Sequence, residues 1–201
     1  MWSIIQAAGW PIWPLIFASV VALALIFERL WSLRQSQVAP EGLVDKVLGD
    51  YKREGLTPEL VAKTAARGPL GRVLAAGLAN VKSPRPVMKE AIEEVGRGVT
   101  HDLDRFLTTL GTIAAMSPLL GLFGTVVGMI EIFGSQTQAG SNPTELAHGI
   151  SVALYNTALG LIVAIPSMIF YRYFRSKVDD LILEMEQQAV KLVELAHGER
   201  R

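Results

Sequence analysis

Three long stretches without a charged residue constrain what this chain can fold into. Residues 1–27, 106–130 and 146–171 contain no Asp, Glu, Lys or Arg, and each is at least 25 residues long. A helix needs about 20 predominantly apolar residues to cross the hydrocarbon core of a bilayer. The overall apolar content would also suit a soluble domain, so the distribution of the charges decides the class. It predicts an all-α integral membrane protein with three transmembrane helices.

The basic residues predict how these helices are oriented. All 19 Lys and Arg residues lie within 29–105 or 172–201, so none precedes the first span or lies between the second and the third. Lys and Arg close to the ends of spans stay on the cytoplasmic side of a membrane. We therefore expect the amino terminus outside the cytoplasm and the carboxyl terminus inside it.

Turn residues and apolar spacing divide the chain into six segments. We expect an outer amino terminus with the first transmembrane helix (1–31), a cytoplasmic helical region (32–105), the second transmembrane helix (106–134), a short outer loop (135–146), the third transmembrane helix (147–174) and a cytoplasmic helical tail (175–201). Short amphipathic helices are expected within the second segment, near 42–54, 58–67 and 70–81.

The second and third transmembrane helices are expected to extend into the cytoplasm. Ser83 can cap a helix that has Pro84 at its first position, and no strong helix breaker follows before Ser117. The sequence thus predicts one long helix that enters the membrane already formed. Beyond the third span, apolar residues again recur at helical spacing and predict an extension with one buried face. These residues are Val178, Leu181, Met185, Ala189 and Leu192.

Small residues line one face of the second span and one face of the third. Between helices in lipid no hydrophobic force drives association, and close backbone contact through small residues takes its place. Spacings of three and four therefore predict close packing of these helices. The residues concerned are Ser117, Gly121, Gly124 and Gly128 in the second span and Gly149, Ala153, Gly160 and Ala164 in the third.

The interior of the spans holds polar residues but no charge. Thr125 and Thr157 are expected at similar depth, because a helix rises about 1.5 Å per residue, and Asn156 is adjacent. Several such helices around a lumen would present a ring of hydroxyls that orients water near a carboxylate of another protein. Alternatively, each threonine bonds the carbonyl three or four residues back in its own helix. The spacing leaves both interpretations open.

Other chemistry is scarce in the sequence. The chain has no cysteine, which excludes disulfides and thiolate chemistry, and its zero formal net charge offers no basic patch for nucleic acid. His101, His148 and His197 are far apart in the sequence, so no metal site is expected. No arrangement of serine or acidic residues suggests hydrolysis. We therefore expect neither an enzyme nor a bound cofactor.

The small-residue motifs of two spans match a known family. The run IAAMSPLLGLFGTVVGM at 113–129 resembles the second-span signature of the MotA/TolQ/ExbB proton channel family. The runs GISVAL at 149–154 and TALGLIVAIP at 157–166 resemble its third-span signature. The three-span layout is similar to the ExbB and TolQ branch, and most to ExbB, whereas MotA-type stators have four spans.

The resemblance implies a homopentameric channel in the bacterial inner membrane, with a periplasmic amino terminus. It implies single-span partners of the ExbD or TolR type, each carrying a membrane aspartate. It further implies a TonB-like or TolA-like protein that transmits the resulting motion to the outer membrane. In the family, the threonines that match Thr125 and Thr157 face the lumen, so the resemblance implies that both line the proton pathway. We expect Asn156 in that pathway as well, because it is adjacent to Thr157 in the sequence.

One position departs from the family pattern. Many relatives have a glutamate where this chain has Val152, so a role of that glutamate in the proton pathway does not carry over. Glu131, near the outer end of the second span, can replace it in part by collecting protons at the outer mouth. The alternative interpretation of Glu131 is an ordinary exposed acid at the membrane interface.

Other functions stay open beside an ExbB-like subunit of a motor that serves the TonB system. The same pattern suits a TolQ-like subunit of the Tol-Pal envelope system. A non-conducting membrane scaffold would also use small residues to pack helices. A solute transporter is disfavoured, because the sequence has neither inverted halves nor a charged site within the membrane.

Overall fold

The computed structural model describes residues 9–135 and 143–197, and every regular element in these ranges is a helix. Three of the helical stretches, within 12–32, 85–134 and 146–196, are long and apolar enough to cross a membrane. The all-α prediction with three spanning stretches is thus confirmed. The helices are α2 (Ile12–Ser32), α3 (Gln35–Val38), α4 (Leu43–Glu54), α5 (Pro58–Ala65), α6 (Pro69–Ala79), α7 (Arg85–Asp104), α8 (Leu107–Ser135) and α9 (Pro143–Ala196).

The chain divides into two compact units that follow the charge pattern. One, here called the apolar unit, comprises Met1–Glu28 and Phe106–Tyr173, and the other, the polar unit, comprises Arg29–Arg105 and Phe174–Arg201. Of the 19 Lys and Arg residues, only Arg172 belongs to the apolar unit. Helix α9 contributes to both units without interruption.

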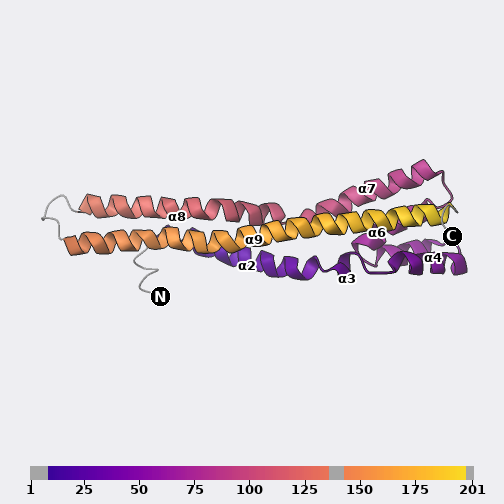
Figure 1. Ribbon diagram of the computed structural model, residues 1–201, viewed down its shortest axis with the longest axis horizontal. Coiled ribbons are helices and arrows are strands. Elements are labelled where there is room, and N and C mark those ends of the chain that lie inside the picture. Colours follow the sequence, from indigo (N-terminus) through magenta and orange to yellow (C-terminus); the bar gives the residue numbers. More distant parts are fainter. Residues whose placement is uncertain (1–8, 136–142, 198–201) are drawn as a thin grey trace. The chain divides into compact units, whose positions relative to one another are not determined.

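In the apolar unit, α8 and the first part of α9 lie side by side (Figure 1). The Trp10 ring, just before α2, meets the Phe123 ring of α8 edge-on, with centroids 5.9 Å apart. Helix α2 buries one apolar face and exposes another, as expected of a helix that meets lipid or a further subunit. The buried residues are Ile12, Leu15, Ala22 and Ile26, and the exposed ones include Phe17, Val20, Leu23 and Phe27.

In the polar unit, short helices pack on the second part of α9. Leu70, Leu74 and Leu78 follow one face of α6 at helical spacing and are fully buried. The face of α9 that apolar spacing predicts is buried too, with Val178, Leu181, Met185, Ala189 and Leu192 each at most 4% exposed. This buried face explains why the helix continues as far as Ala196 after its apolar stretch has ended.

The prediction of one unbroken second helix is wrong. Helix α7 ends at Asp104, and α8 begins at Leu107, after Phe106 with a φ of 66°. At the start of α7, Pro84 rather than Ser83 is the N-cap residue, and the first helical residue is Arg85. The break needs no Gly or Pro, because Nη1 of the buried Arg29 donates a hydrogen bond to the Leu103 carbonyl at 3.1 Å. A carbonyl in the last turn of a helix has no hydrogen-bond donor within that helix, and here the Arg29 guanidinium is its donor.

The helices on either side of the predicted outer loop extend into it, although the spanning stretches themselves end at Gly134 and begin at Leu146. Helix α8 ends at Ser135 and α9 already begins at Pro143, so 143–146, assigned to the loop by the sequence, are helical. The rest of the predicted loop, 136–142, lies outside the described residues. The short helices of the polar unit have bounds close to those predicted, at Leu43–Glu54, Pro58–Ala65 and Pro69–Ala79.

Candidate functional site

The backbones of α8 and α9 touch at two glycines. A Cβ atom added to Gly121 would lie 2.7 Å from the carbonyl oxygen of Asn156 and 3.0 Å from the Cα of Thr157. A Cβ atom added to Gly160 would lie 2.6 Å from the carbonyl oxygen of Ser117. Because these neighbours are backbone atoms, no side chain fits at either glycine without moving a helix.

The other small residues also lie between α8 and α9 or at their buried faces. Gly124 faces the side chain of Asn156, and Gly128 faces the Cβ of Ala153, at 2.8 Å and 3.1 Å from an added Cβ. Gly149 faces the side chain of Ile132, whose nearest atom would lie 2.8 Å away. Ser117 and Ala164 are buried, at 1% and 6% exposure.

This close approach brings Thr125 and Thr157 into direct contact. Their Oγ1 atoms lie 2.5 Å apart, at the face where α8 meets α9. The Thr125 hydroxyl reaches the carbonyl of Gly121 in its own helix, at 3.2 Å, and that of Ala153 in α9, at 3.1 Å. The Thr157 hydroxyl reaches the Gly121 carbonyl in α8, at 3.3 Å. Thr125 therefore bonds within its own helix and across to α9, and Thr157 bonds across to α8.

The two hydroxyls have more acceptors than hydrogens. A hydroxyl carries one hydrogen and two lone pairs, so the two threonines together have two hydrogens to donate. The possible acceptors are the two hydroxyl oxygens and the carbonyls of Gly121 and Ala153. Rotation of either hydroxyl exchanges one acceptor for another at little cost. Both side chains are half-buried, so water or a group from outside the chain can also reach them. The pair can orient water or pass a hydrogen, but it cannot hold a charge near neutral pH.

Asn156 and Glu131 have different surroundings from the threonine pair. Asn156 is 1% exposed, and its side chain packs against Gly124. Glu131 is exposed and lines a cavity of about 350 Å³, which lies near the end of α8 and the start of α9. The cavity also includes Asn156, Val152 and His148 in its lining. We call this space the hairpin cavity.

Sequence reasoning missed the position of His148. It weighed the three histidines only as metal ligands, and their separation excluded that role. A signal was nevertheless present, because Glu131 and His148 flank a short connection between two long apolar stretches. Antiparallel helices joined by a short loop bring such flanking residues to the same end of the pair.

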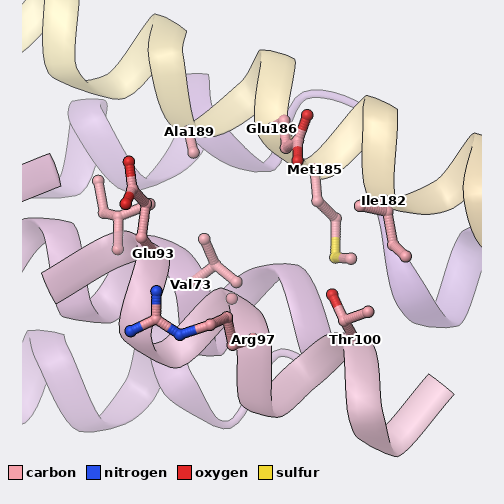
Figure 2. Close-up of a pocket in the computed structure, with 10 residues that line it drawn as sticks. Val73, Glu93, Arg97, Thr100, Ile182, Met185, Glu186 and Ala189 are labelled. Carbon is pink, nitrogen blue, oxygen red and sulfur yellow. The ribbon is translucent and has the colours of Figure 1, made fainter. Parts of the chain in front are cut away.

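The polar unit holds a second cavity, of about 330 Å³, between α6, α7 and α9. Figure 2 shows Val73 and Met185 among its apolar side chains, with Glu93 and Arg97 from α7 and Glu186 from α9 beside them. In the part of the chain that the structure describes, no three His, Cys, Asp or Glu residues are grouped to hold a metal ion. Apolar and charged side chains thus both line this cavity of the polar unit.

One carboxyl group outside the spans has a clearly altered pKa. Asp102 of α7 accepts a hydrogen bond from the Arg72 guanidinium of α6 at 2.7 Å. This hydrogen bond holds the pKa of Asp102 below its ordinary value, because it favours the charged carboxylate. Both side chains are largely exposed to solvent, so the pair joins α6 to α7 at the surface of the polar unit.

Known proteins share this pattern over most of the chain. Residues 65–187 match the model of the MotA/TolQ/ExbB proton channel family, which groups transport proteins rather than enzymes. The ExbB-like 3 biopolymer transport protein of Synechocystis sp. is 34% identical over 168 residues, which cover 81% of this chain and 79% of that protein. The biopolymer transport protein exbB1 of Vibrio cholerae is 34% identical over 168 residues, covering 81% and 74%. The Tol-Pal system protein TolQ of Pseudomonas aeruginosa is 27% identical over 198 residues, covering 90% and 86%. With its family motifs, its three spanning stretches and these relatives, the chain belongs to the MotA/TolQ/ExbB proton channel family.

Proposed function

We propose that this chain is the pentamer-forming subunit of an inner-membrane motor driven by the proton-motive force. In this proposal it works with an ExbD-like single-span partner and energises TonB-dependent transport across the outer membrane. The observation that carries the proposal is the contact between the Thr125 and Thr157 hydroxyls, 2.5 Å apart within spans that hold no charge in their interior.

The chemistry of the hydroxyl pair explains why a partner is needed. Threonine hydroxyls orient water and relay hydrogens, but they do not take up a proton near neutral pH. A motor needs a group that is alternately charged and neutral, and charged groups in the membrane mark ion pathways. In the proposal, the membrane aspartate of the partner is that group. Each protonation beside a threonine pair changes the position that the partner prefers inside the pentamer, and the cycle produces rotation or displacement.

The relatives support the TonB system over the Tol system. The two ExbB-type relatives are 34% identical to this chain, and the TolQ relative is 27% identical, although over a larger share of the chain. A TolQ-like role with TolR-like and TolA-like partners is the alternative, with the same proton chemistry. Expression in cells that lack either ExbB or TolQ distinguishes the two roles. Restored TonB-dependent transport supports the first, and restored envelope integrity without transport supports the second.

The first experiment is native mass spectrometry of the full chain in detergent, alone and with the single-span, Asp-bearing protein encoded nearest to it. We expect a closed homopentamer that takes up the partner. A monomer or dimer that ignores every such partner would contradict the motor and leave the non-conducting scaffold as the better function.

The second experiment measures proton flux through the assembled complex in liposomes. We expect Thr125→Val or Thr157→Val to abolish flux and to leave the pentamer intact, because valine keeps the shape and removes the hydroxyl. Thr125→Ser should retain flux. Thr112→Val is the matched control in α8, since the exposed Thr112 hydroxyl bonds only the Thr108 carbonyl of its own helix, at 2.9 Å. A scaffold would not conduct and would tolerate all of these variants.

A further inference from the structure

The hairpin cavity brings together ionisable residues from two helices. Glu131 is the only Asp, Glu, Lys, Arg or His residue of α8, and His148 is the only one within 146–171 of α9. Both line the cavity, to which the turn before α2 contributes the uncharged Pro11. Among the described residues that line it, Glu131 and His148 are the only ionisable ones. Both side chains are exposed, so each can exchange protons with solvent.

One residue in the wall of this cavity contacts the threonine pair. Ala153 and Asn156 belong to its lining, and they precede Thr157 in α9 by about one turn and by one residue. The Ala153 carbonyl accepts the hydrogen bond from the Thr125 hydroxyl at 3.1 Å. A residue of the cavity wall is therefore bonded directly to the hydroxyl pair.

The cavity is large and polar enough to hold water. Its volume of about 350 Å³ far exceeds the roughly 15 Å³ that one water molecule needs, and buried water also needs several polar partners. Glu131, His148 and Asn156 supply carboxylate, imidazole and amide groups for that purpose. The remaining lining residues are small or apolar and leave the space between these groups open.

We propose that Glu131 and His148 are the proton-collecting pair of the channel, and that the hairpin cavity is its proton vestibule. This inference rests on the proposed function. A proton from the aqueous side binds the Glu131 carboxylate or the His148 imidazole. The new O–H or N–H bond then breaks as cavity water takes the proton toward Thr125 and Thr157, and the collecting group returns to its former state. The proton finally binds the carboxylate of the partner, and the residues of the vestibule are left as they were at the start.

The test measures proton flux through the full complex with its partner in liposomes, at about pH 5 and about pH 8 on the side of the hairpin cavity. Glutamine cannot take up a proton at either pH. We expect His148→Gln to flatten the dependence of flux on pH. We expect Glu131→Gln to lower flux about tenfold, less than the roughly 10²–10⁴-fold that a positioned acid–base group contributes, because His148 still collects protons. Because either residue can collect protons when the other is replaced, the double variant should lose more flux than either single variant.

Two controls separate this inference from the proposed function and from misfolding. Ser151→Ala removes an exposed hydroxyl of α9 that bonds the Ala147 carbonyl at 2.9 Å, and it should leave flux unchanged at both pH values. Native mass spectrometry should give the same pentamer for every variant. If Thr125→Val abolishes flux while Glu131→Gln and His148→Gln keep the wild-type pH profile, the vestibule is excluded and the motor stands. Flux that survives Thr125→Val and Thr157→Val removes the threonine pair from the mechanism, and a wild-type complex without flux overturns the proposed function itself.

Discussion

Gly121 and Gly160 show how single residues set the distance between α8 and α9. At both positions the nearest atoms to an added Cβ belong to the backbone of the opposite helix. Flexible side chains can move aside for a new methyl group, but a carbonyl within a helix moves only with its helix. The threonine contact depends on this spacing, because Thr125 and Thr157 lie about one turn from Gly121 and Gly160.

Gly121→Ala should destabilise the apolar unit by about 1–3 kcal/mol, the usual cost of overpacking a tight interface. The added Cβ would lie 2.7 Å from the Asn156 carbonyl oxygen, closer than real contacts allow. Thermal unfolding of the purified protein in one detergent measures the change. Gly134→Ala is the matched control within α8, since an added Cβ there meets nothing within 4 Å. Equal unfolding temperatures for the two variants would contradict the backbone contact.

The Arg72–Asp102 pair gives the polar unit a dependence on pH. The pKa of Asp102 is lower in the folded protein than its ordinary value, because of the hydrogen bond from Arg72. The pair therefore stabilises the fold above the unfolded pKa of about 4, and this contribution is lost as pH falls through the folded pKa.

Asp102→Asn should accordingly lower the unfolding temperature slightly near neutral pH. The difference from the wild type should shrink as pH falls from about 4 through the lowered folded pKa, below which the wild-type carboxyl is also neutral. Added salt should shrink it as well, because the pair is exposed. Unfolding temperatures at the two pH values provide the measurement, and a difference that grows toward acid pH would have the wrong sign.

Among the helices, the interruption between α7 and α8 is the feature that local sequence least reveals. Phe106 adopts a φ of 66°, a left-handed conformation that costs an L-residue other than glycine about 1–2 kcal/mol. The long-range hydrogen bond from Arg29 to the Leu103 carbonyl favours it. The ion pair between Arg175 and Asp104, at 2.9 Å, lies beside the same helix end.

Phe106→Gly should be more stable than Phe106→Ala, by about 1 kcal/mol. Both variants remove the phenyl ring, so their difference isolates the backbone. In an uninterrupted helix the order reverses, because glycine is about 1 kcal/mol less favourable than alanine there. Thermal unfolding of the two variants decides between the broken helix and the continuous helix that the sequence predicts.

Local patterns explain which elements could be predicted and which could not. The spans and the short helices follow from charge distribution and apolar spacing, which act within a few turns of one helix. The end of α7 is fixed by Arg29, 74 residues away from its bonding partner, so no local pattern encodes it. The rise per residue places Thr125 and Thr157 at similar depth. Their contact also requires the register between α8 and α9, which the touching backbones of Gly121 and Gly160 set.

For the whole molecule, the absence of cysteine makes the expected membrane orientation directly testable. Ser36, Thr144 and Ser176 are exposed, so a cysteine at each is a unique reporter. Thr144→Cys should react with a membrane-impermeant maleimide in intact spheroplasts, because the α8–α9 end is expected outside the cytoplasm. Ser36→Cys and Ser176→Cys should react only after permeabilisation. The opposite labelling pattern would invert the topology that the basic residues predict.

The contact at Gly121 and Gly160 also limits how the gene can vary. Glycine codons begin with two guanines, and any base may stand third without changing the residue. Every amino-acid replacement that one base change produces adds at least a Cβ atom, which at these positions would lie 2.7 Å and 2.6 Å from a backbone oxygen. Two of the three bases in each codon are therefore expected to be fixed by selection, and related genes should differ there only by silent changes.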